Sequence, residues 1–422
     1  MVVHSSPLSF QVLFLVLTIL LQIESHQIED VAAKVEHLPG FDGPLPFHLE
    51  TGYVGLGDTD DDLQVFYYFI KSENDPKNDP LMLWLTGGPG CSSFSGLAYQ
   101  IGPIKFKIEE YNGSLPNLVL RPQSWTKVSS IIFADLPIGT GFSYAKNVTA
   151  HRSHSKLINH THQFIRKGYL LGNPITTGKE SNDQMQYAHG MALISDELYL
   201  SLQRNCKGEY IDIDAKNELC LRDMQYYQEC LSGIDPSYIL DSDCKVDFPM
   251  DDQGTHGRLL IQKLEGPLSS YLTVPTVTCQ AYCSFLTTQW ANSQSVRKAL
   301  HVREEIGKWK RCYTTDFDFD ITSSFEFHVN LSAKGYRSLI FSGDHDLVVP
   351  FLSTQAWIRA LNYSIFDDWR PWLVNGQVAG FTRTYSNQMT FATVKGGGHT
   401  AAEYKPDECL AMFSRWLSNA PL

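Results

Sequence analysis

Short apolar runs alternate along the chain with longer amphipathic stretches. Helical spacing extends over residues 155–167, 187–203 and 353–363. Between and around these stretches, six runs rich in β-branched and aromatic residues predict strands, which begin at Leu63, Leu81, Ser129, Gly168, Arg337 and Met389. Strands that alternate with helices are typical of a mainly parallel sheet covered by helices on both faces. The pattern therefore predicts an α/β fold.

Two parts of the chain depart from this pattern. Residues 1–25 contain an apolar run from about Phe10 to Leu21, too short for a comfortable membrane span, and predict a secretory signal peptide cleaved after Ser25. A signal anchor is the alternative, because no Lys or Arg precedes the run. We expect one domain over residues 26–422. Its insertion or cap covers about residues 200–295, where the periodicity is weak.

Composition narrows the class of protein. The formal net charge is −12, and no run of Lys or Arg suggests a phosphate-binding surface, so a nucleic-acid partner is not expected. Several glycosylation sequons in one chain are typical of a secreted protein. Five are present, at Asn112, Asn147, Asn159, Asn330 and Asn362. We therefore expect an extracellular or vacuolar protein. We also expect no membrane attachment after signal cleavage.

The chain has nine cysteines. In an oxidising compartment they are expected to pair, and zinc is the alternative, although matched CxxC pairs are absent. The odd count leaves one thiol over. Five of the cysteines lie in one stretch: Cys206, Cys220, Cys230, Cys244 and Cys279. Among them, Cys230 and Cys244 are candidates for disulfide bonding.

Three strand ends carry candidate chemistry, because functional groups of open α/β sheets gather at the carboxyl ends of strands. In "WLTGGPGCSS", glycines after a strand leave backbone N–H groups exposed, which suits an oxyanion hole, although a plain turn is the alternative. In "FSGDHDLVVP", an Asp could orient an imidazole or form an Asx-turn. In "KGGGHTAAEYKP", glycines place His399 on a loop, where it could act as a base or be merely solvated.

Along the chain, the candidate oxyanion loop comes first, the candidate acid second and the candidate base third. This order suits an α/β-hydrolase. On the motifs "LWLTGGPGCSS", "SIIFADLPIGTGFSYA", "GYLLGNP", "IFSGDHDLVVPF" and "VKGGGHTAAEYKP", the chain resembles the serine carboxypeptidase family, in particular its plant members. The resemblance implies an α/β-hydrolase fold with a disulfide-rich helical insertion. It also implies triad roles for Asp346 and His399, an oxyanion N–H from Gly88, and a disulfide between Cys91 and Cys312. We choose Asp346 over Asp344 because it directly precedes the "LVVP" turn.

The resemblance also bears on the substrate. Family carboxypeptidases have Asn where this chain has Thr86, and Glu where it has Gln100. Both replacements are similar to the acyltransferase branch, which moves acyl groups from glucose esters onto small acceptors. Trp84, Thr86, Gly87 and Gln100 are the expected substrate-binding residues. The expected partners are a small acyl donor and acceptor, or a peptide C-terminus. We expect no cofactor and no metal, and the oligomeric state stays open.

The junction between one predicted helix and the next predicted strand is unusually short. In "QFIRKGYLLGNP" a helical pattern meets a strand pattern with almost no loop. In the family, a strand, the nucleophile elbow Gly-Asp-Ser-Tyr-Ser-Gly and a helix lie between these two motifs. No Gly-x-Ser-x-Gly occurs anywhere in the chain. We therefore expect that one central βα unit, on the order of 40 residues, is missing.

Three interpretations follow. The chain is an inactive or severely impaired member of the family, or a full-length form of it is an active carboxypeptidase or acyltransferase, or it is a non-catalytic binding glycoprotein. The deletion is also expected to leave the fold destabilised. The strand that begins at Gly168 could move into the vacated place in the sheet.

Overall fold

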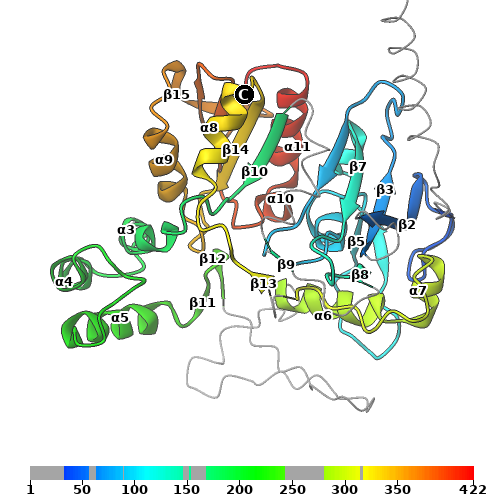
Figure 1. The fold of residues 1–422 in the computed structure, drawn as a ribbon, viewed down its shortest axis with the longest axis horizontal. Helices are drawn as coiled ribbons and strands as arrows, with labels where there is room; N and C mark the ends of the chain where they lie inside the picture. The colour runs from blue at the N-terminus through cyan, green and yellow to red at the C-terminus, as the bar shows by residue number, and fades with distance from the viewer. Residues whose placement is uncertain are drawn as a thin grey trace, which may run out of the picture.

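The computed structural model describes residues 33–56, 63–88, 90–145, 152–153, 168–242, 280–313 and 317–422. Two main sheets organise these residues (Figure 1). The first has the strand order β1–β2–β3–β7–β4, with β8 beside β3, and the second has the order β10–β14–β17–β16–β15. All six predicted strands are present as β3, β4, β7, β10, β14 and β17.

The first sheet is antiparallel except at one edge. Its strands are β1 (Ala33–Val35), β2 (Leu49–Leu56), β3 (Leu63–Ile70), β4 (Leu81–Trp84), β7 (Ser130–Ala134) and β8 (Tyr144–Ala145). Strand β4 pairs with β7 in parallel, with Leu83 opposite Ile132, and has no second neighbour among the described strands.

The second sheet is parallel on one side and antiparallel on the other. Its strands are β10 (Gly168–Gly172), β14 (Arg337–Gly343), β15 (Ile365–Val374), β16 (Gln377–Tyr385) and β17 (Met389–Val394). Strands β10, β14 and β17 are parallel, whereas β16 and β15 form an antiparallel hairpin beside β17. The expected mainly parallel sheet is thus two mixed sheets. Strand β10 pairs with β14 and has not moved beside β4.

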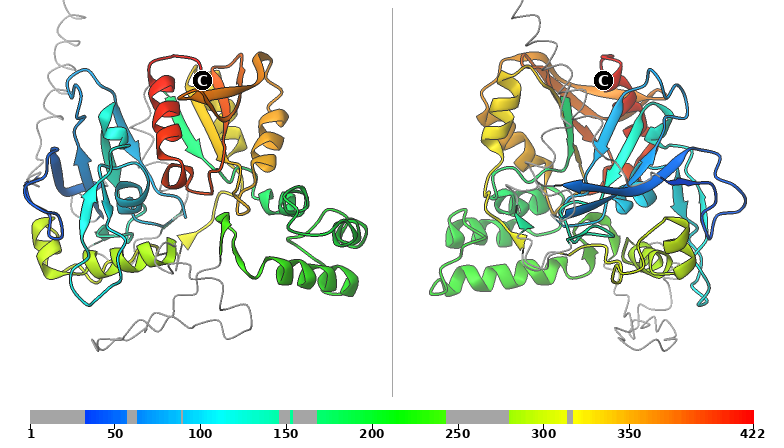
Figure 2. Two further views of the ribbon diagram at one scale, coloured as in Figure 1. Left: turned by 180° about the vertical axis from the view of Figure 1, so that it is seen from behind. Right: turned by 45° about the vertical axis from the view of Figure 1, so that its right-hand side comes forward.

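Two C-terminal helices, α10 (Ala401–Tyr404) and α11 (Pro406–Leu417), lie between the sheets, as Figure 1 and both views of Figure 2 show. Phe413 of α11 stacks on Trp125 with ring centroids 4.1 Å apart. One continuous hydrophobic core includes Phe413, Trp84 of β4 and Phe341 of β14. This core joins the two sheets on the α11 side, although no strand joins them.

The opposite face of the second sheet is covered by α8 (Phe325–Ala333) and α9 (Phe351–Ala360). Trp357 and Ile358 of α9 pack there against Ile340. The prediction of a helix over residues 353–363 is therefore confirmed, with earlier bounds. The predicted helix over residues 155–167 lies outside the described residues.

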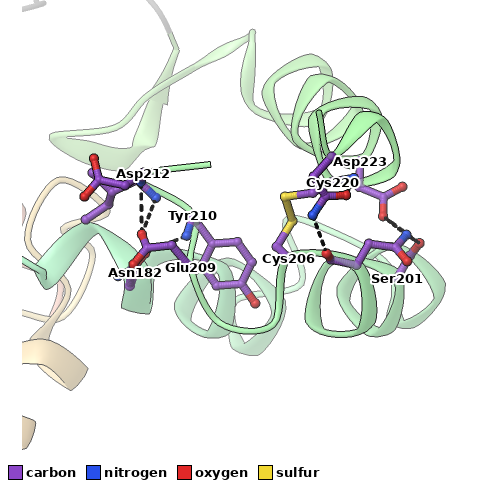
Figure 3. Close-up of a disulfide and its surroundings, with 11 residues drawn as sticks. Asn182, Ser201, Cys206, Glu209, Tyr210, Asp212, Cys220 and Asp223 are labelled. Carbon is purple, nitrogen blue, oxygen red and sulfur yellow. Dashed lines mark hydrogen bonds between the residues drawn. A yellow bond between two sulfur atoms is a disulfide. The ribbon is translucent and has the colours of Figure 1, made fainter. Parts of the chain in front are cut away.

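After η4 (Glu180–Asp183) the chain continues with α3 (Gln184–Gly190), α4 (Asp196–Cys206) and α5 (Glu218–Leu231), and the insertion expected over about residues 200–295 would begin within α4. The helical pattern over residues 187–203 is divided between α3 and α4. Ala192 takes a left-handed conformation with φ of 58°, and Ser195 caps α4 by accepting from the Leu198 N–H. A disulfide between Cys206 and Cys220 joins α4 to α5 (Figure 3).

A short antiparallel hairpin follows α5. It consists of β11 (Ile234–Asp235) and β12 (Tyr238–Ser242). Two further helices, α6 (Gln280–Ala291) and α7 (Gln294–Ala299), pack under the first sheet, where Trp290 stacks on Phe94.

The remaining elements are small. They are η1 (Gly96–Gln100), β5 (Ile104–Phe106), β6 (Leu118–Leu120), η2 (Trp125–Lys127), β9 (Arg152–Ser153), η4 (Glu180–Asp183) and β13 (Phe317–Asp318). Within the described ranges, no helix has the length and apolar character needed to cross a membrane. Residues 1–25, predicted as a signal peptide, lie outside those ranges.

Candidate active site

Asp346 and His399 meet at the carboxyl end of the second sheet. Asp346 lies three residues after β14, and His399 lies five residues after the neighbouring strand β17. The His399 Nδ1 atom lies 2.8 Å from Asp346 Oδ2. The Asp346 side chain is fully buried, whereas the His399 side chain is 35% exposed. The ring is therefore held from one side and open on the other.

The Asp346 carboxylate accepts three further hydrogen bonds. Asn173 Nδ2 donates to Oδ2 at 2.6 Å, and the N–H groups of Val348 and Val349 donate to Oδ1 at 2.8 and 3.2 Å. These donors hold the carboxylate in one orientation toward the imidazole. The sequence analysis did not identify Asn173. Its place directly after β10, the strand next to β14, was the available signal.

Asp344 has a different role from Asp346. Its Oδ1 atom accepts from the Gly396 N–H at 2.6 Å and lies 2.6 Å from His345 Nδ1. Asp344 therefore holds the loop that leads to His399, whereas the His399 imidazole is hydrogen-bonded to Asp346. A Cβ atom on Gly343 would lie 2.2 Å from the Gly398 carbonyl, so only glycine allows the two loops to approach this closely.

The β11–β12 hairpin is attached to both loops. The His399 N–H donates to the Ser237 carbonyl at 2.6 Å. The Pro236 carbonyl accepts from Leu347 at 2.9 Å and from Val348 at 3.2 Å. The backbone of the acid–base pair is thus fixed by a hairpin distant in sequence, which the sequence analysis did not identify.

The predicted oxyanion loop follows β4. Gly87 and Gly88 are exposed, and a Cβ atom on Gly88 would lie 2.9 Å from Cys91 Sγ. The backbone at Gly88 therefore passes very close to a disulfide, which joins Cys91 to Cys312 with an S–S distance of 2.03 Å. That bond is the one the family resemblance implied.

Asp135 holds the other end of this loop, and the sequence analysis missed it. Its Oδ1 accepts from Ser92 Oγ at 2.6 Å and from the Ser93 N–H at 3.0 Å. Its Oδ2 accepts from the Phe142 N–H at 3.1 Å. Complete burial raises the pKa of Asp135 to about 7, although the Ser92 hydrogen bond opposes the increase.

The residues predicted to bind substrate lie on and after β4. Trp84 Nε1 donates to Thr86 Oγ1 at 3.1 Å, and the absent side chain of Gly96 leaves room for the indole. Gln100 is half-buried at the end of η1. Among the described residues, no hydrogen bond joins Gln100 to Thr86, so the structure brings Trp84 and Thr86 together but not all four residues.

No serine in the described ranges is hydrogen-bonded to His399, and its Nε2 atom has no hydrogen-bond partner there. Ser92 donates to Asp135, and Ser93 donates to the Trp84 carbonyl at 3.2 Å. Ser143, in the near-match "GFSYA", is buried and accepts from the Phe66 N–H at 2.7 Å. Each of these hydroxyls is occupied in holding the first sheet and its loops.

Other predicted residues fall at the surface or outside the described ranges. Asn112, Asn330 and Asn362 are exposed, and Asn147 and Asn159 lie outside the ranges. Cys230 is an exposed free thiol, so it is not disulfide-bonded as expected; its candidate partner Cys244 lies outside the ranges. Sequence position alone could not separate Cys230 from Cys206 and Cys220, which do pair. The described residues contain no metal-binding group of three or more His, Cys, Asp or Glu.

Comparisons with known proteins point to one family. The family described as serine carboxypeptidase matches residues 39–167 and 159–419. The chain is 46% identical to serine carboxypeptidase-like 19 of Arabidopsis thaliana over 470 positions, covering 98% of this chain and 99% of that protein. Serine carboxypeptidase-like 2 of the same plant is also 46% identical, covering 94% of this chain and 95% of that protein.

A solved structure supports the fold. The prohormone-processing carboxypeptidase KEX1 from Saccharomyces cerevisiae is similar with a TM-score of 0.64 at 18% identity, over 93% of this chain and 96% of that one. The 470 positions aligned with serine carboxypeptidase-like 19 exceed the 422 residues of the chain, so that relative has residues with no counterpart here. The two family matches overlap over residues 159–167, just before β10.

Proposed function

The chain belongs to the serine carboxypeptidase family, with its α/β-hydrolase fold, and we propose that this form keeps the acid–base pair but lacks the nucleophile. Asp346 and His399 would be the acid and base of a catalytic triad. The observation that carries the proposal is the pair itself. It is assembled and buried on the Asp346 side, while His399 Nε2 faces no serine of the described residues.

The chemistry explains the expected loss. A serine nucleophile forms the acyl-enzyme, and the residue after it supplies the second oxyanion N–H. Loss of a triad nucleophile lowers kcat by about 10⁶-fold, and loss of one oxyanion donor costs roughly 3 kcal/mol of transition-state stabilisation. We therefore expect this chain to be inactive or severely impaired as a hydrolase or acyltransferase.

Two observations support a missing βα unit. Strands β4 and β10 are the open ends of two sheets, and each is parallel to its one neighbour. The family matches overlap just before β10, and the alignment with serine carboxypeptidase-like 19 is longer than the chain. Loss of one strand between β4 and β10 would account for both.

For the reaction of the full-length form, we favour acyl transfer from a glucose ester to a small acceptor over removal of a residue from a peptide C-terminus. Gln100 supports this choice, because an amide, unlike the Glu of family carboxypeptidases, cannot share an acid proton with a substrate carboxylate. Thr86 supports it because it replaces the Asn that helps to hold the carboxylate of a peptide C-terminus in those carboxypeptidases. The proposed substrate-binding residues are Trp84, Thr86, Gly87 and Gln100, with an oxyanion N–H from Gly88. Peptide hydrolysis remains the alternative for the full-length form.

We propose the secretory pathway as the location, with the mature protein extracellular or vacuolar. The Cys91–Cys312 and Cys206–Cys220 disulfides support an oxidising compartment. The exposed sequons at Asn112, Asn330 and Asn362 support glycosylation. A shift in electrophoretic mobility after enzymatic removal of N-glycans would test this part.

A fluorophosphonate probe tests the catalytic proposal, because it reacts only with an activated serine. The probe should not label the present chain. It should label a variant in which the segment of serine carboxypeptidase-like 19 is inserted between Lys167 and Gly168. Labelling should disappear when His399→Ala is added to that variant.

Labelling of the present chain would overturn the proposal, because some serine would then be activated. Absence of labelling in a folded insertion variant would also contradict it, because Asp346 and His399 would then not activate a restored serine. Saturable binding of a phenolic glucose ester without turnover would favour a binding glycoprotein.

A further inference from the structure

Strands β4 and β10 are edge strands, and their exposure is unusual for parallel strands, which are normally covered on both faces. Leu81 of β4 is 62% exposed, and no residue of β10 is fully buried. In β14, by contrast, every residue after Arg337 is buried. Both exposed strands are nevertheless apolar, reading "LMLW" and "GYLLG".

The hydrophobic packing differs between the two faces of these strands. On the α11 side, Met82 and Leu170 both pack against the continuous core that spans the two sheets. On the opposite side, Leu83 packs against one small cluster and Leu171 against a separate one. Among the described residues, the core is therefore continuous on one face and divided into two clusters between β4 and β10 on the other.

The two open strands also end at the same edge of the molecule. Helix α10 follows β17 and His399, and it contacts η1, which follows β4. Since β10 is parallel to β14 and β14 to β17, the carboxyl end of β10 faces the loop that carries His399. The carboxyl end of β4 leads into the loop that carries Gly88. A strand placed between them, parallel to both, would end between those two loops.

We propose that β4 and β10 form an acceptor site for one β-strand supplied by a separate polypeptide. The occupant is a strand–turn–helix segment with four or five apolar strand residues, parallel to Leu81–Trp84 and Gly168–Gly172. Its helix would cover the divided face between Leu83 and Leu171. This inference rests on the proposed function for the identity of the segment. The direction of the two open strands sets the direction of the added strand, and their apolar residues set its apolar character.

A second copy of this chain is a poorer occupant than such a segment. The main-sheet strands that a copy offers already have partners on at least one side, and its own β4 and β10 are tied to β7 and β14. The relatives, in contrast, contain residues that have no counterpart in this chain. A segment of that kind is free to pair on both sides, as the site requires.

The test mixes the full-length secreted chain with a separate polypeptide, the segment that serine carboxypeptidase-like 19 has opposite the Lys167–Gly168 junction, carrying a serine-to-alanine substitution. Backbone hydrogen exchange is then followed by mass spectrometry. We expect exchange to slow at least ten-fold over residues 81–84 and 168–172, with no change in β15. A second sample uses the unsubstituted segment and the fluorophosphonate probe.

Controls separate strand pairing from non-specific contact. A segment with two prolines in its strand should give no protection, because it lacks the N–H donors. Leu83→Pro in the chain should abolish binding, whereas Phe366→Pro, at an exposed edge position of β15, should leave it intact. If the Leu83→Pro variant does not fold, the segment with two prolines by itself tests whether binding depends on strand pairing.

The outcomes distinguish the two proposals. Protection of both strands without labelling of the segment's serine would support the strand site and contradict the proposed function. Labelling of the covalent insertion variant, without protection by the separate segment, would keep the proposed function and overturn the strand site. A dimer of the chain that pairs through β4 or β10 and excludes the segment would also overturn it.

Discussion

Each of the two sheets carries part of the candidate site, and the part on the second sheet is more complete than the part on the first. In the second sheet, Asn173, Asp346 and His399 come from the ends of three neighbouring parallel strands, and Asn173 and His399 are both hydrogen-bonded to Asp346. In the first sheet, the loop through Gly88 follows β4, the open edge, and Gly87 and Gly88 are exposed. The candidate site residues are therefore assembled where adjacent strands are present, and the site is incomplete beside β4, which has no second neighbour among the described strands.

The means of attachment differ as well. The acid–base pair is held by hydrogen bonds from Asn173, the Asp346 loop and the β11–β12 hairpin. The predicted oxyanion loop is held by the Cys91–Cys312 disulfide and by the buried carboxyl group of Asp135. The comparison predicts that the first sheet depends on a covalent link and a buried carboxyl group, whereas the second depends on polar contacts.

The largest expected effect is on the covalent link of the first sheet. Replacing both Cys91 and Cys312 by Ser should lower the free energy of unfolding by about 5 kcal/mol, because the bond closes a loop with a sequence separation of 221. The matched double variant at Cys206 and Cys220, with a separation of 14, should lose about 3 kcal/mol. Denaturant titrations measure both. Equal losses would contradict the dependence of the first sheet on this bond.

The next effect is on the second sheet. Asp346→Ala should lower the free energy of unfolding by about 3 kcal/mol, because Asn173 and two backbone N–H groups lose a buried acceptor. Asp344→Ala, at a partly exposed carboxylate, should lose about 1 kcal/mol. Thermal unfolding gives the ranking. A reversed order would mean that Asp344, rather than Asp346, organises the pair.

A pH effect on stability is expected from Asp135. Its pKa in the folded protein, about 7, lies above the ordinary 3.8, so the folded state binds the proton more tightly. Its contribution to stability is full below pH 4 and is lost as the pH rises through 7. Asp135→Asn should flatten the decline in unfolding free energy between pH 4 and pH 7. An unchanged slope would contradict the assignment.

A smaller effect of opposite sign is expected from His328 of α8, the helix that packs on the second sheet. Burial lowers its pKa from 6.5 to about 4, and its Nδ1 lies 2.8 Å from the Tyr169 hydroxyl. Its contribution is present above pH 6.5 and is lost as the pH falls through 4. His328→Gln should therefore reduce the loss of stability on acidification. Greater acid sensitivity in this variant than in the parent would contradict the prediction.

Several features could be predicted from the sequence because they depend on local patterns. The apolar runs at Leu63, Arg337 and Met389 became strands since their residue types favour extended, half-buried backbone. Asp346 and His399 could be chosen because each lies on the loop that follows such a run, in a motif that resembles the family. The order of oxyanion loop, acid and base along the chain indicated a hydrolase site, and the structure places His399 Nδ1 2.8 Å from Asp346 Oδ2.

Other features depended on which distant segments meet. Asn173 and Ser237 became neighbours of the acid–base pair through packing that no periodicity encodes. Cys206 and Cys220 paired while Cys230 did not, because pairing follows the distance between folded helices rather than spacing in sequence.

The sequence by itself determined the strands, the choice of Asp346 and His399 as candidates, and the absence of a Gly-x-Ser-x-Gly motif, because each depends on residues close together in the chain. Only the tertiary structure decided what β10 does when it directly follows the junction at Lys167. It could pair with β4 or with β14, and it pairs with β14 in parallel. The reason is the shared packing of Tyr169 and Leu171 against Ile340, which a place beside β4 would give up.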